Sequence, residues 1–397
     1  MKDHIALLQR HMEKLCEKIG ARPTGSAKNK EAVDYALEVF QKCGLQTYKQ
    51  EFDCMDWINS GATLILNGQN VPVEPAGYSL PCDFEAKYVC LDTVDALQKA
   101  ELSGKMAVLH GDLCKEPLMP KNFEFYNPDE HKQIIALLEE KNPVAIITVS
   151  PHNEHIIQDG DFNIPCAVAC ENMLNTFLQS TRQKAKLTIN AERTLAKAHN
   201  VIATYGTNRG KVCFSAHIDT KWATPGALDN ASGVSVLLAL AESLSGKEYP
   251  FQLEIVLLNG EDYYSTPGEI KYMGDLTPEY NLAINVDGIG LKDSTTSVSF
   301  YECSQGIKNR IMERVGKTTG IEQIDPWPMG DHMIFATFGI PTIAITASNI
   351  FSLLETVIHT PDDDVKNIDW SILDNIVRFL LSCVEGWEND MDVFYSM

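Results

Sequence analysis

The sequence predicts an α/β fold, in which a doubly wound, mostly parallel sheet has helices on both faces, together with a smaller inserted α+β domain. From residue 200 onward, short apolar runs of strand character alternate with segments whose apolar residues recur at helical spacing. Between about residues 54 and 190, short strand-like runs dominate, and Pro and Gly separate them. The chain of 397 residues is also longer than a single hydrophobic core usually supports.

These observations predict two domains. We expect residues 1–53 and 191–397 to form one discontinuous domain and residues 54–190 to form the insert. At the N-terminus, apolar residues recur at helical spacing over residues 4–19, and a second amphipathic helix is expected over residues 28–43. Each of these segments is followed by a glycine, and the alternating pattern that follows the second one predicts a strand over residues 45–52.

The insert and the second half of the chain differ in their pattern. In the insert we expect strands over residues 62–66, 105–110, 144–150, 167–170 and 185–189, with helices near 130–141 and 171–183. Beyond it we expect strands over residues 200–205, 211–216, 252–258, 282–286, 298–301 and 341–346, the first two joined as a hairpin. Helices are expected over residues 230–244, 305–318, just after 331, and from about 368. Ligands of such sheets lie beyond the carboxyl ends of the strands.

The composition excludes some classes of partner. A net charge of −21 argues against nucleic acid and against an anionic membrane surface, because both attract positively charged proteins. No apolar run reaches the length of a membrane span, and the first residues do not form a signal peptide. Eleven cysteines without a regular spacing favour a reducing compartment, so we expect a cytoplasmic protein. The sequence makes no prediction of oligomeric state.

Histidine and acidic residues follow several of the expected strands. His217 and Asp219 come at the end of strand 211–216, and Asp229 begins the helix 230–244. Alone, His217 could be a structural histidine and Asp229 a helix N-cap. Together they have the chemistry of a divalent metal site.

Three later segments supply further groups of the same kind. Glu261 and Asp262 follow strand 252–258, Asp287 follows strand 282–286, and His359 lies in a loop before the last helix. Each of these alone is typical of a solvated turn or loop. Because the carboxyl ends of parallel strands meet at one edge of a sheet, the set predicts one site with metal ligands and a general base.

The motifs resemble those of the M28 family of metallo-aminopeptidases. The matching residues are His217-x-Asp219, Gly226-Ala-x-Asp229-Asn-x-Ser-Gly233, Glu261-Asp262, Asp287 and His359-Thr-Pro-x-Asp363, with weaker matches at Arg22-Pro-Thr-Gly-Ser26 and at Asp331-His-x-x-Phe335 followed by Gly339-Ile-Pro341. The resemblance covers about residues 5–52 and 198–385 and implies a zinc-peptidase-like fold. The insert is similar to a protease-associated domain in its position and strand pattern. Such a domain would restrict access to the cleft, so that only short peptides enter it.

The resemblance implies a role for each site residue. Asp229 would bridge two divalent metal ions, most often Zn²⁺, with Co²⁺ or Mn²⁺ as substitutes. His217 and Asp287 would complete the ligands of one ion, and Asp262 and His359 those of the other. The implied catalytic residues are Glu261 and Asp219: Glu261 would be the general base, and Asp219 would hold His217 in its metal-binding tautomer. The implied substrate is a peptide with a free N-terminus.

Two departures and several alternatives accompany this interpretation. Asp262 stands where the family more often has Glu, and Gly330 where Ser is common. A carboxypeptidase, a dipeptidase or a single-zinc glutaminyl cyclase could use the same scaffold, as could a non-catalytic interaction protein. The presence of His217 disfavours the cyclase, and the intact ligand set and base disfavour the non-catalytic protein. Four aromatic residues could line a substrate pocket or simply pack, namely Trp222, Tyr263, Tyr264 and Trp327.

Overall fold

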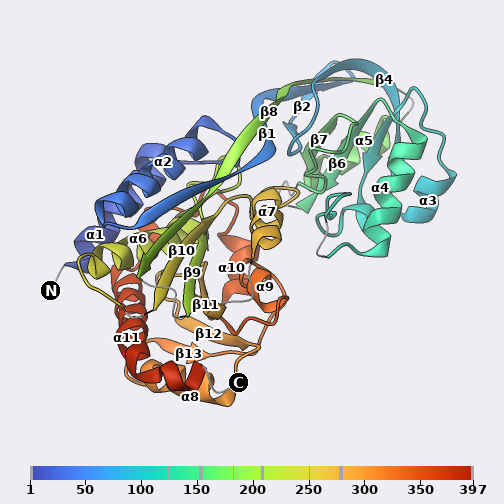
Figure 1. The fold of residues 1–397 in the computed structure, drawn as a ribbon. Helices are drawn as coiled ribbons and strands as arrows, with labels where there is room; N and C mark the ends of the chain where they lie inside the picture. Colours follow the sequence, from blue (N-terminus) through green and yellow to red (C-terminus); the bar gives the residue numbers. More distant parts are fainter. Residues whose placement is uncertain are drawn as a thin grey trace. The chain divides into compact units, whose positions relative to one another are not determined.

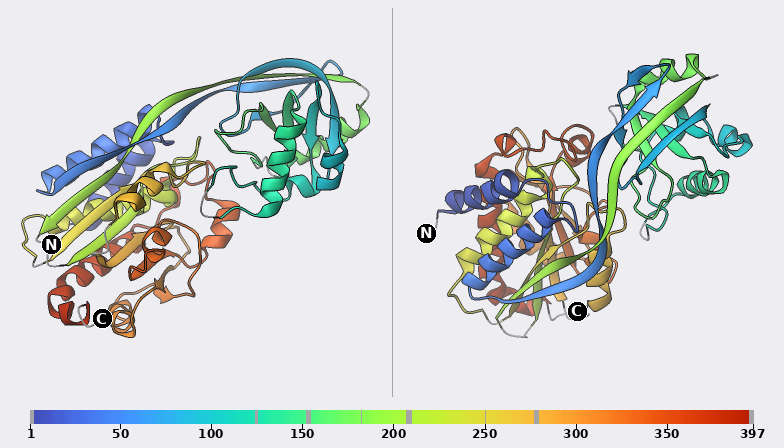
Figure 2. Two further views of the ribbon diagram at one scale, coloured as in Figure 1. Left: turned by 45° about the vertical axis from the view of Figure 1, so that its right-hand side comes forward. Right: turned by 90° about the horizontal axis from the view of Figure 1, so that it is seen from above.

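The fold is that of a computed structural model, which describes residues 3–123, 126–151, 155–181, 183–206, 210–249, 251–276 and 280–394, with side chains as far as residue 387 (Figures 1 and 2). The chain divides into two compact units. The first comprises Met1–Cys54 and Ala196–Met397, and the second comprises Met55–Leu195. Two long strands, β1 (Gln46–Leu66) and β8 (Lys184–Gly206), run from one unit into the other.

The sheet of the first unit has the order β13-β12-β14-β11-β9-β10-β8. Its central strands are β9 (Lys211–His217), β10 (Gln252–Leu258), β11 (Tyr280–Val286) and β14 (Thr342–Ala347), and neighbours among them run parallel. Antiparallel partners flank this centre, namely β8 beside β10 and β12 (Thr296–Tyr301) beside β14, while β13 (Ile321–Gln323) pairs parallel with β12. The α/β fold is thus confirmed, as a mixed sheet with a parallel centre.

The hairpin expected between residues 200–205 and 211–216 is wrong. Strand β10 lies between the two segments, pairing antiparallel with β8 through Ile255 and Ala203 and parallel with β9 through Ile255 and Phe214. Short sequence separation favours a hairpin only when no other strand is available. Here the strongly apolar β10 takes the buried central place, where both of its edges are paired.

Helices cover both faces of this sheet (Figure 1). Alternate strand residues such as Phe214 and Ile255 share the larger core with α1, α2, α6, α8 and α11, whereas Cys213 and Val256 share a smaller core with α7 and α9. The helices of the larger core are α1 (His4–Met12, continued by Glu13–Ile19), α2 (Ala27–Lys42), α6 (Ser232–Leu244), α8 (Gln305–Val315) and α11 (Trp370–Phe394). Those of the smaller core are α7 (Pro267–Asp275) and α9 (His332–Ala336). No helix in the described residues is long and apolar enough to cross a membrane.

The second unit has a smaller sheet of the order β8-β4-β5-β6-β7-β3. Its parallel strands are β4 (Cys82–Leu91), β5 (Met106–Leu109), β6 (Ala145–Ser150) and β7 (Cys166–Cys170), with antiparallel β8 and β3 (Glu74–Pro75) at the two edges. Its remaining elements are β2 (Gln69–Val71), α3 (Val94–Lys99), α4 (Asp129–Lys141) and α5 (Leu174–Gln179). The expected domain boundaries, after residues 53 and 190, and the likeness to a protease-associated domain stay predictions.

Candidate metal centre

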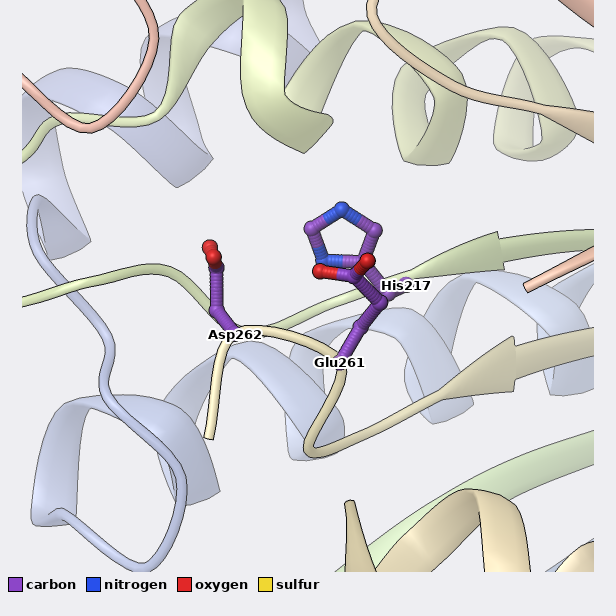
Figure 3. Close-up of side chains that lie close together, drawn as sticks. All are labelled: His217, Glu261 and Asp262. Carbon is purple, nitrogen blue, oxygen red and sulfur yellow. The ribbon is translucent and has the colours of Figure 1, made fainter. Parts of the chain in front are cut away.

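The parallel register of the first unit gathers the predicted site residues at one edge of the sheet. His217 is the last residue of β9 and pairs with Leu258, the last residue of β10. The loop after β10 therefore raises Glu261 and Asp262 beside His217, as Figure 3 shows. Asp287 directly follows β11, the other neighbour of β9.

Asp229 lies at the middle of this cluster. Its Oδ1 is 2.8 Å from Nε2 of His217, and its Oδ2 is 3.1 Å from Nε2 of His359. Nε2 of His217 is also 3.5 Å from Oδ1 of Asp287, and Nε2 of His359 is 2.9 Å from Oδ1 of Asp262. The ligand atoms thus form two groups of three, one with His217 and one with His359, and Asp229 belongs to both.

Several of these atoms are buried without a hydrogen bond. Within the described part of the chain, both ring nitrogens of His217 and the Oδ1 atoms of Asp262 and Asp287 have no hydrogen-bond partner, although acceptor and donor atoms lie nearby. A buried polar atom left without a partner costs about 1–3 kcal/mol. Imidazole nitrogen and carboxylate oxygen are ligands of Zn²⁺ and related dications, so the residues present fit metal ions.

Glu261 belongs to a third group, in which its carboxylate lies within 4.8 Å of the His217 and Asp262 ligand atoms. Burial raises its pKa well above the usual range, the His217 ring opposes this shift, and the charge of Asp262 adds to it. A nearby dication would lower the pKa again, because positive charge favours the ionised carboxylate. Glu261 is therefore placed to exchange a proton with a molecule at the centre.

The spacing within the Gly226–Gly233 motif has a local cause. The Asn230 side chain donates from Nδ2 to the carbonyl of Val286, 2.9 Å away, and accepts at Oδ1 from the amide of Gly233. A Cβ at Gly233 would lie 2.3 Å from that same carbonyl, so only glycine fits. The segment Ala227–Ala231, which carries Asp229 and precedes α6, is thereby fastened to the end of β11, which Asp287 directly follows.

Asp219 holds the loop that carries the acidic pair. Its Oδ1 accepts from the amide of Gly260 at 2.8 Å, and its Oδ2 accepts from the amide of Asp262 at 3.2 Å and from the hydroxyl of Thr24 at 2.9 Å. The distance from its Oδ1 to Nδ1 of His217 is 3.7 Å, which is too long for a hydrogen bond. Asp219 therefore positions the loop that carries Glu261 and Asp262, and its expected role at the His217 ring stays a prediction.

Three further residues support the site, and none of them has a role predicted from the sequence. Asp363 accepts the amides of Leu228 and Asp229 at 2.5 and 3.0 Å. Arg22 is fully buried and donates to backbone carbonyls of the loop after β9. Lys221 donates from Nζ to the Asp262 carbonyl at 2.7 Å, and from its amide to Oδ2 of the same residue at 3.1 Å. Arg22 and Asp363 lie within quoted motifs, whereas nothing in the sequence distinguishes Lys221.

The four candidate aromatic residues separate by burial. Tyr263 and Tyr264 are buried, and their rings lie 4.3 Å apart, so both serve packing. Trp222 and Trp327 are half-buried.

The fold and this arrangement of histidines and carboxylates define a metallopeptidase, a class of hydrolase. The comparisons with known proteins make the class more specific. The model of Peptidase family M28 matches residues 200–384, just under half of the chain, and this part of the chain is therefore similar to that family. The matched segment contains both histidines and all the carboxylates of the three groups.

The relatives agree with this assignment. Aminopeptidase YwaD of Bacillus subtilis strain 168 is 23% identical over 377 residues, which cover 90% of this chain and 79% of the relative. The crystal structure of BSAP, a zinc aminopeptidase from Bacillus subtilis, has a TM-score of 0.76 at 18% identity and covers 96% of this chain and 95% of that chain. A glutaminyl cyclase from Tannerella forsythia shares the fold more distantly, with a TM-score of 0.51 at 14% identity and 96% of each chain covered.

Proposed function

We propose that this chain is an aminopeptidase that removes N-terminal residues from peptides and works with two divalent metal ions, most often Zn²⁺, with Co²⁺ or Mn²⁺ as substitutes. The observation that carries the proposal is the position of Asp229, whose two carboxylate oxygens face two different histidines, His217 and His359. Asp229, His217 and Asp287 would hold one ion, and Asp229, Asp262 and His359 the other. Metal ions bound there polarise the scissile carbonyl and make a water molecule more acidic.

The chain's own groups supply the proton transfer. In this proposal Glu261 accepts the proton of the attacking water and passes it to the nitrogen of the departing peptide. Asp219 keeps Glu261 and Asp262 in place through the amides of Gly260 and Asp262. Both ends of the Gly260–Asp262 segment donate to the one buried carboxylate of Asp219, and these hydrogen bonds keep the loop beside His217.

The charge of the whole chain favours the N-terminal end of a peptide. Two dications would roughly balance the four carboxylates of the site, on Asp229, Glu261, Asp262 and Asp287. The net charge of −21 on the chain would still attract a cationic amine and repel a C-terminal carboxylate. This supports an aminopeptidase over a carboxypeptidase.

The glutaminyl cyclase and the non-catalytic protein remain the alternatives. A single-zinc cyclase has no use for a second complete ligand group, so the pairing of His217 with Asp229 and Asp287 supports the peptidase. A non-catalytic protein has no need of Glu261. We further propose a cytoplasmic location, which the irregular spacing of the eleven cysteines supports.

The decisive experiment compares aminoacyl p-nitroanilides with N-acetylated counterparts, before and after removal of metal by a chelator and its replacement by Zn²⁺. We expect hydrolysis of the free amines alone, its loss with the chelator and its return with the metal. Glu261→Gln should reduce kcat by a factor of at least about 10² while the bound metal remains, because the base is lost and the ligands are not. Hydrolysis of acetylated substrates, or turnover that resists the chelator, would contradict the proposal.

A further inference from the structure

The loop between β10 and α7, residues 259–266, carries Glu261, and its two ends meet at one side chain. That side chain is Asn200, which is fully buried and lies in β8 beside the end of β10. Its Oδ1 accepts from the amide of Asn259 at 2.9 Å, and its Nδ2 donates to the carbonyl of Gly268 at 2.7 Å. The Asn200 side chain therefore joins the first residue of the loop to the first turn of α7.

The two backbone partners determine which residue can stand at position 200. The amide of Asn259 can only donate and the carbonyl of Gly268 can only accept, so the side chain needs an acceptor and a donor on one short group. Aspartate would have no proton for the carbonyl, and alanine would leave both backbone groups buried without this partner. The second proton of Asn200 Nδ2 is donated to Oε1 of Gln50 at 2.8 Å, so both of its donors are used.

Close packing also brings the two ends of the loop together. A Cβ at Gly268 would lie 1.9 Å from the carbonyl oxygen of Asn259 and 2.7 Å from Oδ1 of Asn200. Only glycine therefore allows the start of α7 to approach the end of β10 so closely. A Cβ at Gly260 would lie 3.3 Å from Cδ of Pro267, at the opposite end of the loop. The base of the loop is thus closed by packing as well as by Asn200.

The first residue of the loop is held by its own side chain as well. Nδ2 of Asn259 donates to Oδ1 of Asn29 at 2.9 Å and to the carbonyl of His199 at 3.0 Å. Its Oδ1 accepts from Nδ2 of Asn29 at 2.9 Å and from the hydroxyl of Thr24 at 3.3 Å. Asn259 would keep these contacts if Asn200 were changed. Such a change would therefore act first on the end of the loop that enters α7.

We propose that Asn200 is a positioning residue for the reaction, which closes the loop at its base and so holds Glu261 in place beside His217. This inference rests on the proposed aminopeptidase function. Asp219 binds two amides within the loop, whereas Asn200 joins the loop's ends, so the two side chains act at different places. Positioning of this kind matters for the rate, because a displacement of about 1 Å can slow a catalysed step by roughly 10²-fold.

The kinetic test uses the aminoacyl p-nitroanilide that the wild type hydrolyses fastest, at saturating Zn²⁺. We expect Asn200→Asp to lower kcat and kcat/KM equally, by roughly 10–100-fold, because Glu261 is displaced while substrate binding is unaffected. Tyr272→Phe is the matched control, since the buried Tyr272 hydroxyl donates to Glu254 at 2.8 Å and so joins α7 to β10 near the start of that strand, away from the loop. It should lower stability and leave kcat unchanged. An equal loss of kcat in both variants would overturn the proposal.

Hydrogen exchange, followed by mass spectrometry, separates this inference from the proposed function because it needs no turnover. Amides of residues 260–266 should exchange about tenfold faster in Asn200→Asp than in the wild type or Tyr272→Phe, with and without Zn²⁺. Gly268→Ala forces the two ends apart with Asn200 unchanged, and it gives the same test should Asn200→Asp not fold.

The outcomes distinguish the two proposals. A wild type that hydrolyses no aminoacyl p-nitroanilide would overturn the aminopeptidase function, and faster exchange in Asn200→Asp would still support the closed loop. Equal exchange in the wild type and Asn200→Asp, or faster exchange without any loss of kcat, would overturn the positioning role of Asn200.

Discussion

Among single residues, Asp262 departs most from the family pattern, and Lys221 helps to define its surroundings. The Lys221 ammonium is 3.7 Å from Oδ1 of Asp262, the atom that faces His359, and the Lys221 amide occupies Oδ2. Only Oδ1 of Asp262 is therefore left to bind an ion, and the positively charged Lys221 ammonium lies beside it. The ion at His359 should thus be the more weakly held of the two.

Lys221→Met should tighten the binding of this second ion by roughly tenfold, because like charges a few ångströms apart repel strongly even at an effective dielectric constant near 20. Competition with a chromogenic chelator measures the two affinities separately. Lys271→Met, a change at an exposed lysine paired with Asp275, should leave both unchanged. Identical affinities in the wild type and Lys221→Met would show that the lysine does not act on the site.

The sequence predicts the metal-ligating residues better than it predicts the residues that contact them. His217, Asp287 and the Glu261–Asp262 pair each follow an apolar strand, and polar residues at a strand end are visible without any structure. No local sequence pattern predicts the role of Lys221, because its contact with Asp262 joins two loops that are 41 residues apart. Which atoms Asp219 accepts from is likewise set by the fold, so its role at the Gly260–Asp262 loop could not be predicted.

At the scale of elements, the junction of α6 with β11 holds the bridging residue. A Cβ at Gly233 would meet the Val286 carbonyl at 2.3 Å and Oδ1 of Asn230 at 2.4 Å. We expect Gly233→Ala to lower the free energy of unfolding of the metal-free protein by about 1–3 kcal/mol, the usual cost of overpacking. Gly274→Ala is the control, because Gly274 lies in α7 with open space around it, and alanine favours helix by about 0.5–1 kcal/mol. Urea unfolding measures both, and an unchanged midpoint for Gly233→Ala would contradict the tight contact.

The packing of α1 on α6 should depend on pH through Glu242. Its hydrogen bond with His11 and its pairing with Arg10 outweigh partial burial and lower its pKa to about 2. The pKa of Glu242 in the folded protein lies below its ordinary value of 4.5. The ionised carboxylate therefore stabilises the folded protein fully above pH 4.5, and this contribution is lost as the pH falls towards 2. Glu242→Gln should lower the free energy of unfolding by about 1–3 kcal/mol at pH 7, with a smaller loss at pH 3.

Unfolding curves of wild type and variant between pH 3 and 7 check this expectation. Glu385→Gln removes an exposed pairing with Lys247 and should change stability by less than about 1 kcal/mol throughout. A loss for Glu242→Gln that is the same at pH 3 and pH 7 would show that its charge is not the cause.

Elements were predicted well where a local pattern determines them. The strand expected over residues 252–258 is β10, and the helices expected over residues 4–19 and 28–43 are present. The segments expected as strands 45–52 and 62–66 are parts of the single strand β1, because polar residues between them are tolerated on an exposed sheet face. The pairing of β10 between β8 and β9 depends on competition among strands, which no local pattern records.

At the scale of the whole molecule, one unit contains the entire candidate site. Both histidines, the carboxylates of the three groups, and the supporting residues Arg22, Thr24 and Asp363 all belong to the unit formed by Met1–Cys54 and Ala196–Met397. The order of the motifs along the chain allowed the sequence to predict their convergence. The sharing of Asp229 between two ligand groups is the feature on which the proposed chemistry depends.

The most direct test of that sharing is the number of zinc ions retained per chain after dialysis, measured by elemental analysis in wild type, His359→Ala and Asp229→Ala. We expect two ions in the wild type, one in His359→Ala and fewer than one in Asp229→Ala, because only the last change removes a ligand from both groups. A single ion in the wild type, or a loss in Asp229→Ala no greater than in His359→Ala, would contradict a bridging Asp229.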